Sequence, residues 1–186
     1  NYISLSDVKL GINYLLIISN SSGLWRYNIG DTIQFTEIDP YRIIVTGRIK
    51  HFISAFGEHV IGKEVETTIK EIALKFKLRI REFTVAPQVN PRKGLPFHEW
   101  FIEFDEINDK LDAIETIMDN IMQRQNVYYK DLIQGKILSP LKITKIKKGG
   151  FNDYMKSIGK LGGQNKVPHL SNDRKIANDL LNYIIQ

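Results

Sequence analysis

The stretch GRIKHFISAFGEHV, residues 47–60, separates two parts of the sequence that follow different patterns. Gly47 and Gly57 suit tight turns, because glycine adopts backbone conformations that other residues avoid. Arg48 places a fixed positive charge beside the first of these turns. Its planar fork of donors suits hydroxyl or phosphate oxygens, but a hairpin with an exposed arginine explains the pattern equally well. We therefore place a domain boundary in this stretch.

Residues 1–47 show the pattern of a small antiparallel sheet. Three runs are rich in β-branched and aromatic residues, and turn-forming residues separate them. The expected strands are residues 14–19, 32–35 and 41–45, with turns at NSSG (20–23) and EIDP (37–40). We predict a small β meander, or the remnant of a barrel, for this first domain.

Residues 48–186 alternate between helical and strand patterns. The stretch GKEVETTIKEIALKF places Val65, Ile69 and Ile72 on one helix face, and NDKLDAIETIMDNIMQ repeats this spacing. The expected elements are helices at 62–76, 108–123, 151–158 and 173–185, and strands at 80–87, 98–104 and 141–146. From residue 49 onward the order strand, helix, strand, strand, helix, strand is that of the split βαβ of ferredoxin-like folds. The sequence predicts an α+β chain.

Composition narrows the classes of protein that fit. The 186 residues are 42% hydrophobic, enough for a buried core, and the absence of cysteine excludes thiolate chemistry, disulfides and cysteine-bound zinc. The longest apolar run, at residues 14–18, is far shorter than the roughly 18 to 20 residues that a membrane span needs. With no secretory leader, we expect a cytoplasmic protein without membrane contact. Because the chain begins at Asn1 rather than Met, we expect a piece of a longer protein.

The net charge of +5 fits a nucleic-acid partner, an anionic small ligand or no specific partner. The strands at 83–87 and 98–104 lack the aromatic and basic pattern of RNA-binding sheets, so we expect no nucleic acid. His51 and His98 form no pair with a carboxylate at metal-ligand helical spacing, so no metal site is predicted. The sequence also lacks the Gly-x-Ser-x-Gly motif of serine hydrolases.

The stretch GLWRYNIGD, residues 23–31, ends in an aspartate behind a glycine. A carboxylate at the start of a strand can accept hydrogen bonds from two adjacent hydroxyls, such as those of a ribose. Aspartate after glycine is also common turn chemistry. Spacing alone favours the turn for Asp31.

A second candidate site lies in KSIGKLGGQNKVPHLSND, residues 156–173. Glycine lets the backbone approach a phosphate closely, and lysine neutralises the charge that develops on it. A solvated basic loop has the same composition. Leu161, Val167 and Leu170 give the loop apolar side chains to bury, so we expect it to be ordered.

Four segments in order resemble the bacterial branch of the Gretchen Hagen, or auxin-responsive promoter, family of acyl acid amido synthetases. They are GLWRYNIGDTIQFT (23–36), YRIIVTGRIKHFISAFGE (41–58), HEWFIEF (98–104) and GKLGGQNKVPHLSNDRK (159–175). The family belongs to the adenylate-forming superfamily, with the acyl-CoA synthetases and firefly luciferase. The resemblance implies an enzyme that uses ATP and Mg²⁺ to convert a carboxylic acid to an acyl-adenylate. The acyl group then passes to the amine of an amino acid.

The resemblance also implies roles for residues near the boundary. Tyr27 and Asp31 match the Tyr-x-x-Gly-Asp motif, whose aspartate holds the adenylate ribose. Arg48 matches the superfamily arginine that also reaches this ribose. Residues 49–51 fall where these enzymes hinge between the adenylation and transfer steps.

In the C-terminal loop the resemblance implies a phosphate-binding lysine. Lys166, in QNKVP, matches the family lysine that meets the phosphates, and Lys160, in SIGKLGG, is a rival assignment. We prefer Lys166. His169 stands where the family pattern usually has arginine, which puts a fixed charge at this position in doubt.

The family keeps its phosphate loop and acyl pocket in a large N-terminal domain that this sequence does not contain. The resemblance therefore makes residues 1–47 the end of that adenylate-binding domain and residues 48–186 its mobile cap. We expect the 186 residues alone to be inactive. The alternatives are a piece of another adenylate-forming enzyme, such as an acyl-CoA ligase, or a non-catalytic ferredoxin-like binding module.

Overall fold

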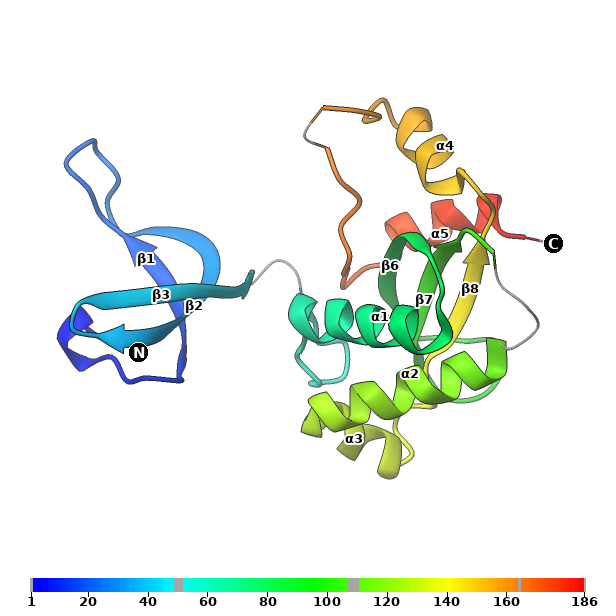
Figure 1. The fold of residues 1–186 in the computed structure, drawn as a ribbon, viewed down its shortest axis with the longest axis horizontal. Helices are drawn as coiled ribbons and strands as arrows, with labels where there is room; N and C mark the ends of the chain where they lie inside the picture. The colour runs from blue at the N-terminus through cyan, green and yellow to red at the C-terminus, as the bar shows by residue number, and fades with distance from the viewer. Residues whose placement is uncertain (1, 49–51, 107–110, 164, 186) are drawn as a thin grey trace. The chain divides into compact units, whose positions relative to one another are not determined.

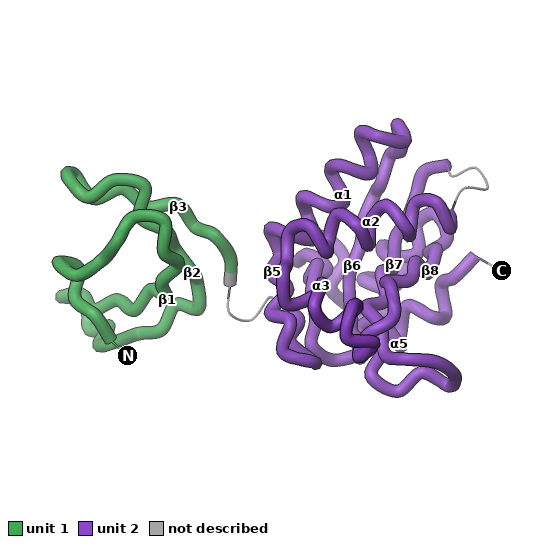
Figure 2. Tube along the Cα trace, turned by 90° about the horizontal axis from the view of Figure 1, so that it is seen from below, with its two compact units in different colours: residues 1–51 green, residues 52–186 purple. Residues whose placement is uncertain are grey.

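The computed structural model describes residues 2–48, 52–106, 111–163 and 165–185. The chain divides into two compact units, residues 1–51 and 52–186 (Figure 2). The hinge expected at residues 49–51 lies outside the described residues. Among the helices that are described, none combines the length and the apolar character needed to cross a membrane.

Unit 1, residues 1–51, is an antiparallel sheet with the strand order β1-β2-β3 (Figure 1). A short 3₁₀ helix, Leu5–Asp7, precedes the strands β1 (Asn13–Ile18), β2 (Tyr27–Ile38) and β3 (Tyr41–Arg48). The predicted β meander is confirmed. Ile33 and Phe35 of β2 are its buried apolar residues, and the ring of Phe35 contacts the edges of Tyr14 and Tyr41.

The central strand β2 begins earlier than the sequence pattern indicates. Asn28, Gly30 and Asp31 belong to residue types that are depleted in strands, so the expected strand started at residue 32. In the structure Tyr27 and Asn28 pair with β1 and Asp31 pairs with β3, while the Gly30 N–H donates to the Asn28 side chain. Pairing on both sides therefore outweighs local propensity.

Unit 2, residues 52–186, is built on a sheet with the order β6-β7-β8, in which β6 and β7 are antiparallel and β7 and β8 parallel. β4 (Phe52–Ile53) and β5 (Val60–Ile61) form a separate hairpin. The remaining elements are α1 (Gly62–Phe76), β6 (Ile80–Gln88), β7 (Phe97–Phe104), α2 (Leu111–Gln125), α3 (Val127–Gln134), β8 (Lys142–Ile146), α4 (Gly150–Ser157), α5 (Lys175–Leu180) and a 3₁₀ turn (Leu181–Tyr183).

Helices cover both faces of this sheet. Trp100 and Ile102 of β7 pack in one core with residues of α1 and α2, whereas Phe101 packs in a second core with residues of α4 and α5. Successive side chains of a strand point to opposite faces, so both faces of β7 are buried. A strand buried on both faces usually reads as a near-continuous apolar run, but in β7 this run is limited to residues 100–102. The flanking Glu99 and Glu103 are buried with hydrogen-bond partners.

The α+β class is confirmed, with one difference from the expected topology. A split βαβ places another strand between its two parallel strands, but β7 and β8 are direct hydrogen-bonded neighbours. The first strand expected near residue 49 does not join this sheet in the described part of the chain. Instead β4 turns back onto β5, because Gly57 and His59 both have positive φ and reverse the chain.

Two helices differ from the sequence pattern. α3 was not expected, although Asn126 caps its start by accepting a hydrogen bond from the Tyr129 N–H. The last helix was expected over 173–185, but α5 ends at Leu180. The chain then pairs with the end of β8, where Ile184 lies opposite Ile146. The expected start of α2 at 108–110 lies outside the described residues.

Candidate nucleotide site

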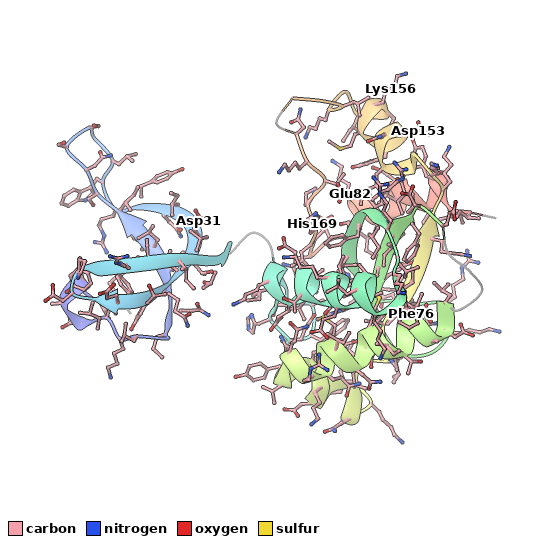
Figure 3. All side chains as sticks on the ribbon, in the orientation of Figure 1. Asp31, Phe76, Glu82, Asp153, Lys156 and His169 are labelled. Atoms are coloured by element: carbon pink, nitrogen blue, oxygen red, sulfur yellow. The ribbon has the colours of Figure 1, made fainter. Side chains whose placement is uncertain are left out.

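The first group of candidate residues lies on neighbouring strands of unit 1. Asp31 lies on β2 and Arg48 at the end of β3, and the antiparallel register pairs them directly. The two residues that the sequence comparison linked to a ribose are thus brought together by strand pairing. The turn preferred for Asp31 from spacing alone is wrong, because Asp31 lies within a strand (Figure 3).

The backbone before Asp31 is specialised. Gly30 has φ +82°, a conformation that residues with a Cβ rarely adopt, and its N–H donates to Asn28 Oδ1 at 2.8 Å. The strand pairings on both sides are irregular nearby, between Leu15 and Ile17 and between Thr32 and Ile33. Such irregularities re-aim side chains and are common beside functional sites. Tyr27, at the start of the same strand, is exposed.

The second group lines a cavity in unit 2. Lys160 and Lys166 both lie along a cavity of about 490 Å³ that is bordered by the start of β6, by α4 and by the loop after α4. Both lysines are exposed, and the side chains of both are without a hydrogen-bond or ion-pair partner in the part of the chain that the structure describes. The cavity therefore brings the preferred lysine and its rival to one place.

Backbone pairing holds the end of this loop on the edge of the sheet. The Val85 N–H donates to the His169 carbonyl and the Ser171 N–H to the Val85 carbonyl, both at 3.0 Å. Val167 and Leu170 are buried, as expected, whereas Leu161 is exposed and the expectation for it is wrong. The loop is therefore fixed at its C-terminal end, just beyond Lys166.

His169 joins two elements through carboxylates. Its Nε2 lies 3.4 Å from Glu82 of β6, and both residues are labelled in Figure 3. Its Nδ1 lies 3.4 Å from Glu66 of α1, and its ring stacks on Phe83. The hydrogen bond with Glu82 raises the pKa of His169. Burial opposes this shift, and the charges of Glu82 and Glu66 add to it. A histidine in place of the family arginine therefore still favours a positive charge here.

Two arginines that line the cavity were not predicted as site residues from the sequence. Arg79 and Arg81, at the start of β6, line the same cavity as Lys160 and Lys166. The segment Leu-Arg-Ile-Arg-Glu-Phe, residues 78–83, carried the signal, because it places two cations two residues apart at the start of a strand. In the described part of the chain, no group of three or more His, Asp or Glu side chains is arranged to hold a metal ion.

Chemically, the two groups suit different parts of a nucleotide. A carboxylate accepts hydrogen bonds from sugar hydroxyls, while lysine and arginine neutralise phosphate oxygens. Asp31 and Arg48 belong to unit 1, and the lysine cavity belongs to unit 2.

Comparison with known proteins gives the same family for both units. Residues 1–48 match the GH3 family central domain, and residues 63–175 match the GH3 family C-terminal domain. The chain is 26% identical to indole-3-acetic acid-amido synthetase GH3.3 of Arabidopsis thaliana, over 89% of this chain and 30% of that protein. It is 24% identical to jasmonoyl--L-amino acid synthetase GH3.5 of Oryza sativa subsp. japonica, over 91% of this chain and 30% of that protein.

A solved structure shares the fold. The GH3.15 acyl acid amido synthetase superposes with a TM-score of 0.78 at 21% identity, over 99% of this chain and 35% of that one. The chain spans about 30% of the length of the curated relatives it matches. Because the C-terminal domain match alone covers more than half of the residues, the chain belongs to the GH3 family, the Gretchen Hagen family of acyl acid amido synthetases.

Proposed function

We propose that this chain is the C-terminal portion of an ATP-dependent enzyme that joins a carboxylic acid to an amino acid through an acyl-adenylate. Family membership and the amido synthetase activities named for its relatives support this proposal. The observation that carries it is the direct pairing of Asp31 with Arg48 on β2 and β3. In this proposal residues 1–47 end the adenylate-binding domain and residues 48–186 form a mobile cap.

The unit 1 residues act on the nucleoside. Asp31 accepts hydrogen bonds from the ribose hydroxyls, which fixes the position of the α-phosphate relative to the acid. Arg48 donates to the same sugar, and Tyr27 lies at the start of the strand that carries Asp31. ATP is the substrate that supplies the adenylate, and Mg²⁺ accompanies it on the phosphate oxygens.

Lys166 acts on the phosphates. Attack of the acid on the α-phosphate builds negative charge there and on the departing pyrophosphate, and an ammonium group stabilises both. Two observations support this role: the Lys166 side chain has no partner among the described residues, and it lines a cavity. We also propose a cytoplasmic location for the protein.

The test uses the full-length protein with ATP, Mg²⁺, a panel of carboxylic acids and the amino acids. We expect pyrophosphate release that depends on one class of acid, and a product whose mass is that of acid plus amino acid minus water. Coenzyme A replaces the amino acids in a parallel reaction. A thioester product without any amide would contradict the proposal and assign the chain to an acyl-CoA ligase.

A pair of variants decides between the two lysines. Lys166→Ala should slow adenylation more than it changes ATP binding, because its contact forms mainly in the transition state. Lys160→Ala is the matched control from the same cavity. Loss of adenylation with Lys160→Ala, and none with Lys166→Ala, would move the role to Lys160.

A further inference from the structure

We propose that the cavity between β6 and α4 binds an inorganic polyphosphate anion, pyrophosphate, and that Arg79 and Arg81 supply one wall of this site. The choice of pyrophosphate rests on the proposed function, because adenylation releases that anion. The cationic site itself follows from the described residues alone.

The cavity has an excess of positive charge. Four cationic side chains line it, Arg79, Arg81, Lys160 and Lys166, against two carboxylates, Glu82 and Glu103. A hollow lined by one sign of charge attracts a ligand of the opposite sign. How strongly the cations attract a ligand therefore depends on whether these two carboxylates pair with them.

Both carboxylates are committed to partners within the protein. Glu103 is buried and accepts hydrogen bonds from the backbone N–H groups of Gly149 (2.7 Å) and Phe151 (3.3 Å), at the start of α4. Glu82 accepts a hydrogen bond from the Phe83 N–H (3.0 Å) and faces His169. Neither carboxylate forms an ion pair with a lysine or arginine of the cavity among the described residues. Lys160 and Lys166 therefore have no carboxylate partner among the described residues, and the two arginines share the single carboxylate of Asp105.

A β-bulge directs Arg81 toward the cavity. In the pairing of β6 with β7, Ile80 lies opposite Phe104 and Glu82 opposite Glu103, so Arg81 is the extra residue. Ile80 and Phe83 both pack with the core under α1 and α2, although regular alternation would place them on opposite faces. The extra residue at the bulge reverses the alternation of side chains, so Ile80 and Phe83 can face the same side of the sheet. Arg81 thus lines the cavity on the α4 side of the sheet.

Asp105 orients both arginines. Arg81 Nε donates to one carboxylate oxygen of Asp105, and Arg81 Nη2 forms an ion pair with the same oxygen. Arg79 Nε lies 3.2 Å from the other oxygen. The Nη1 group of Arg81 has no acceptor among the described residues. An arginine fork held at one end by a carboxylate keeps donors directed at an incoming anion, and guanidinium matches phosphate geometry.

The positive surface continues past the arginines. A second hollow of about 380 Å³ has four cations and two carboxylates in its lining, so it also has an excess of positive charge. Its lining residues are Lys77, Arg79, Arg81, Asp105, Glu106 and Lys148. The two lysines draw anions toward the arginines from solvent, a long-range effect that salt weakens. The arrangement provides a route for pyrophosphate between the cavity and bulk water.

Titration of the 186-residue chain with inorganic pyrophosphate at low salt, followed by calorimetry, tests this site. We expect Arg81→Gln to weaken binding about tenfold, because it removes charged hydrogen bonds. Arg79→Gln should weaken it roughly threefold, since this side chain is 82% exposed and screened by water. Arg92→Gln removes an equal charge from the exposed β6–β7 loop, outside the cavity, and should leave binding unchanged.

Circular dichroism of each variant verifies the fold. If Arg81→Gln fails to fold, Arg79→Gln still decides the outcome. Equal affinity in the wild type and a folded arginine variant would overturn the inference. An equal loss with Arg92→Gln, or no binding to the wild type, would also overturn it. Because the titration contains no ATP, acid or amine, its result is separate from the activity test: an active enzyme that fails this titration refutes only the pyrophosphate site.

Discussion

His169 shows how one side chain can join separate elements of the fold. Its ring lies between Glu66 on α1 and Glu82 on β6 and stacks on Phe83. Both carboxylates favour the protonated ring, which raises the pKa of His169. The residue thus couples the loop that carries Lys166 to the rest of unit 2 through charge.

His169→Gln should make the stability of the chain less dependent on pH. A histidine with a raised pKa contributes stability that is fully present below its unfolded pKa, about 6.5, and lost as the pH rises through its folded pKa. The variant should therefore lower the free energy of unfolding more at pH 5.5 than at pH 8.5. Urea denaturation at both pH values measures this difference. Glu66→Gln removes one of the two carboxylates beside His169 and should reduce the pH dependence of stability in part. A larger loss at pH 8.5 would contradict the assignment.

Asp31 marks the limit of prediction at single positions. Its residue type, its place behind Gly30 and its short spacing all predict a turn, and only pairing with β1 and β3 places this segment in a strand. The pairing with Arg48 could be anticipated from the family resemblance but not from local sequence. Arg81 could not be anticipated, because its direction depends on a bulge that follows from the partner strand.

Among the elements, a buried polar network links the β4–β5 hairpin to β7 and to the helices. Glu58 contacts His98 Nε2 at 2.8 Å, and the Asn126 side chain donates to the Glu58 carbonyl (3.0 Å) and to Glu64 (3.2 Å). Burial raises the pKa of Glu58, but its hydrogen bond with His98 and the histidine charge outweigh burial and lower the pKa overall. The network fixes the segment that follows residues 49–51 onto the body of unit 2.

Asn126→Ala should destabilise unit 2 by about 2 to 3 kcal/mol. The loss combines an N-cap worth about 1 kcal/mol with the cost of leaving buried acceptors unpaired. Urea denaturation monitored by circular dichroism gives the value. Asn120→Ala, on the exposed side of α2, is the matched control and should change stability little. Equal stability of both variants would show that Asn126 has no such linking role.

Some helices and strands could be predicted from the sequence pattern better than others, for physical reasons. α1 and α4 agree closely with the expected 62–76 and 151–158, because each has an apolar stripe facing the sheet. α3 lacks a long periodic pattern, so only its cap could have indicated it. β4 pairs with β5 and β7 pairs with β8, and no local signal determines which strands become neighbours.

For the whole chain, we propose that residues of both units contact the nucleotide, each unit contacting a different part of it. Asp31 and Arg48, proposed for the ribose, pair on strands of unit 1, and Lys166, proposed for the phosphates, lines a cavity of unit 2. Each unit folds around its own buried residues, so a substitution in one should not unfold the other. Binding and catalytic effects can therefore be separated by mutating one unit at a time.

The central claim is that Asp31 holds the nucleotide, and the most direct measurement is the dissociation constant of ATP for the full-length protein with and without this carboxylate. Asp31→Ala should weaken ATP binding roughly 10- to 150-fold, because hydrogen bonds to a charged group contribute about 1.5 to 3 kcal/mol. Glu37→Ala removes a partly exposed carboxylate from the same strand, one that pairs with Arg42, and should leave ATP binding unchanged. Unchanged ATP affinity in a folded Asp31→Ala variant would contradict the account.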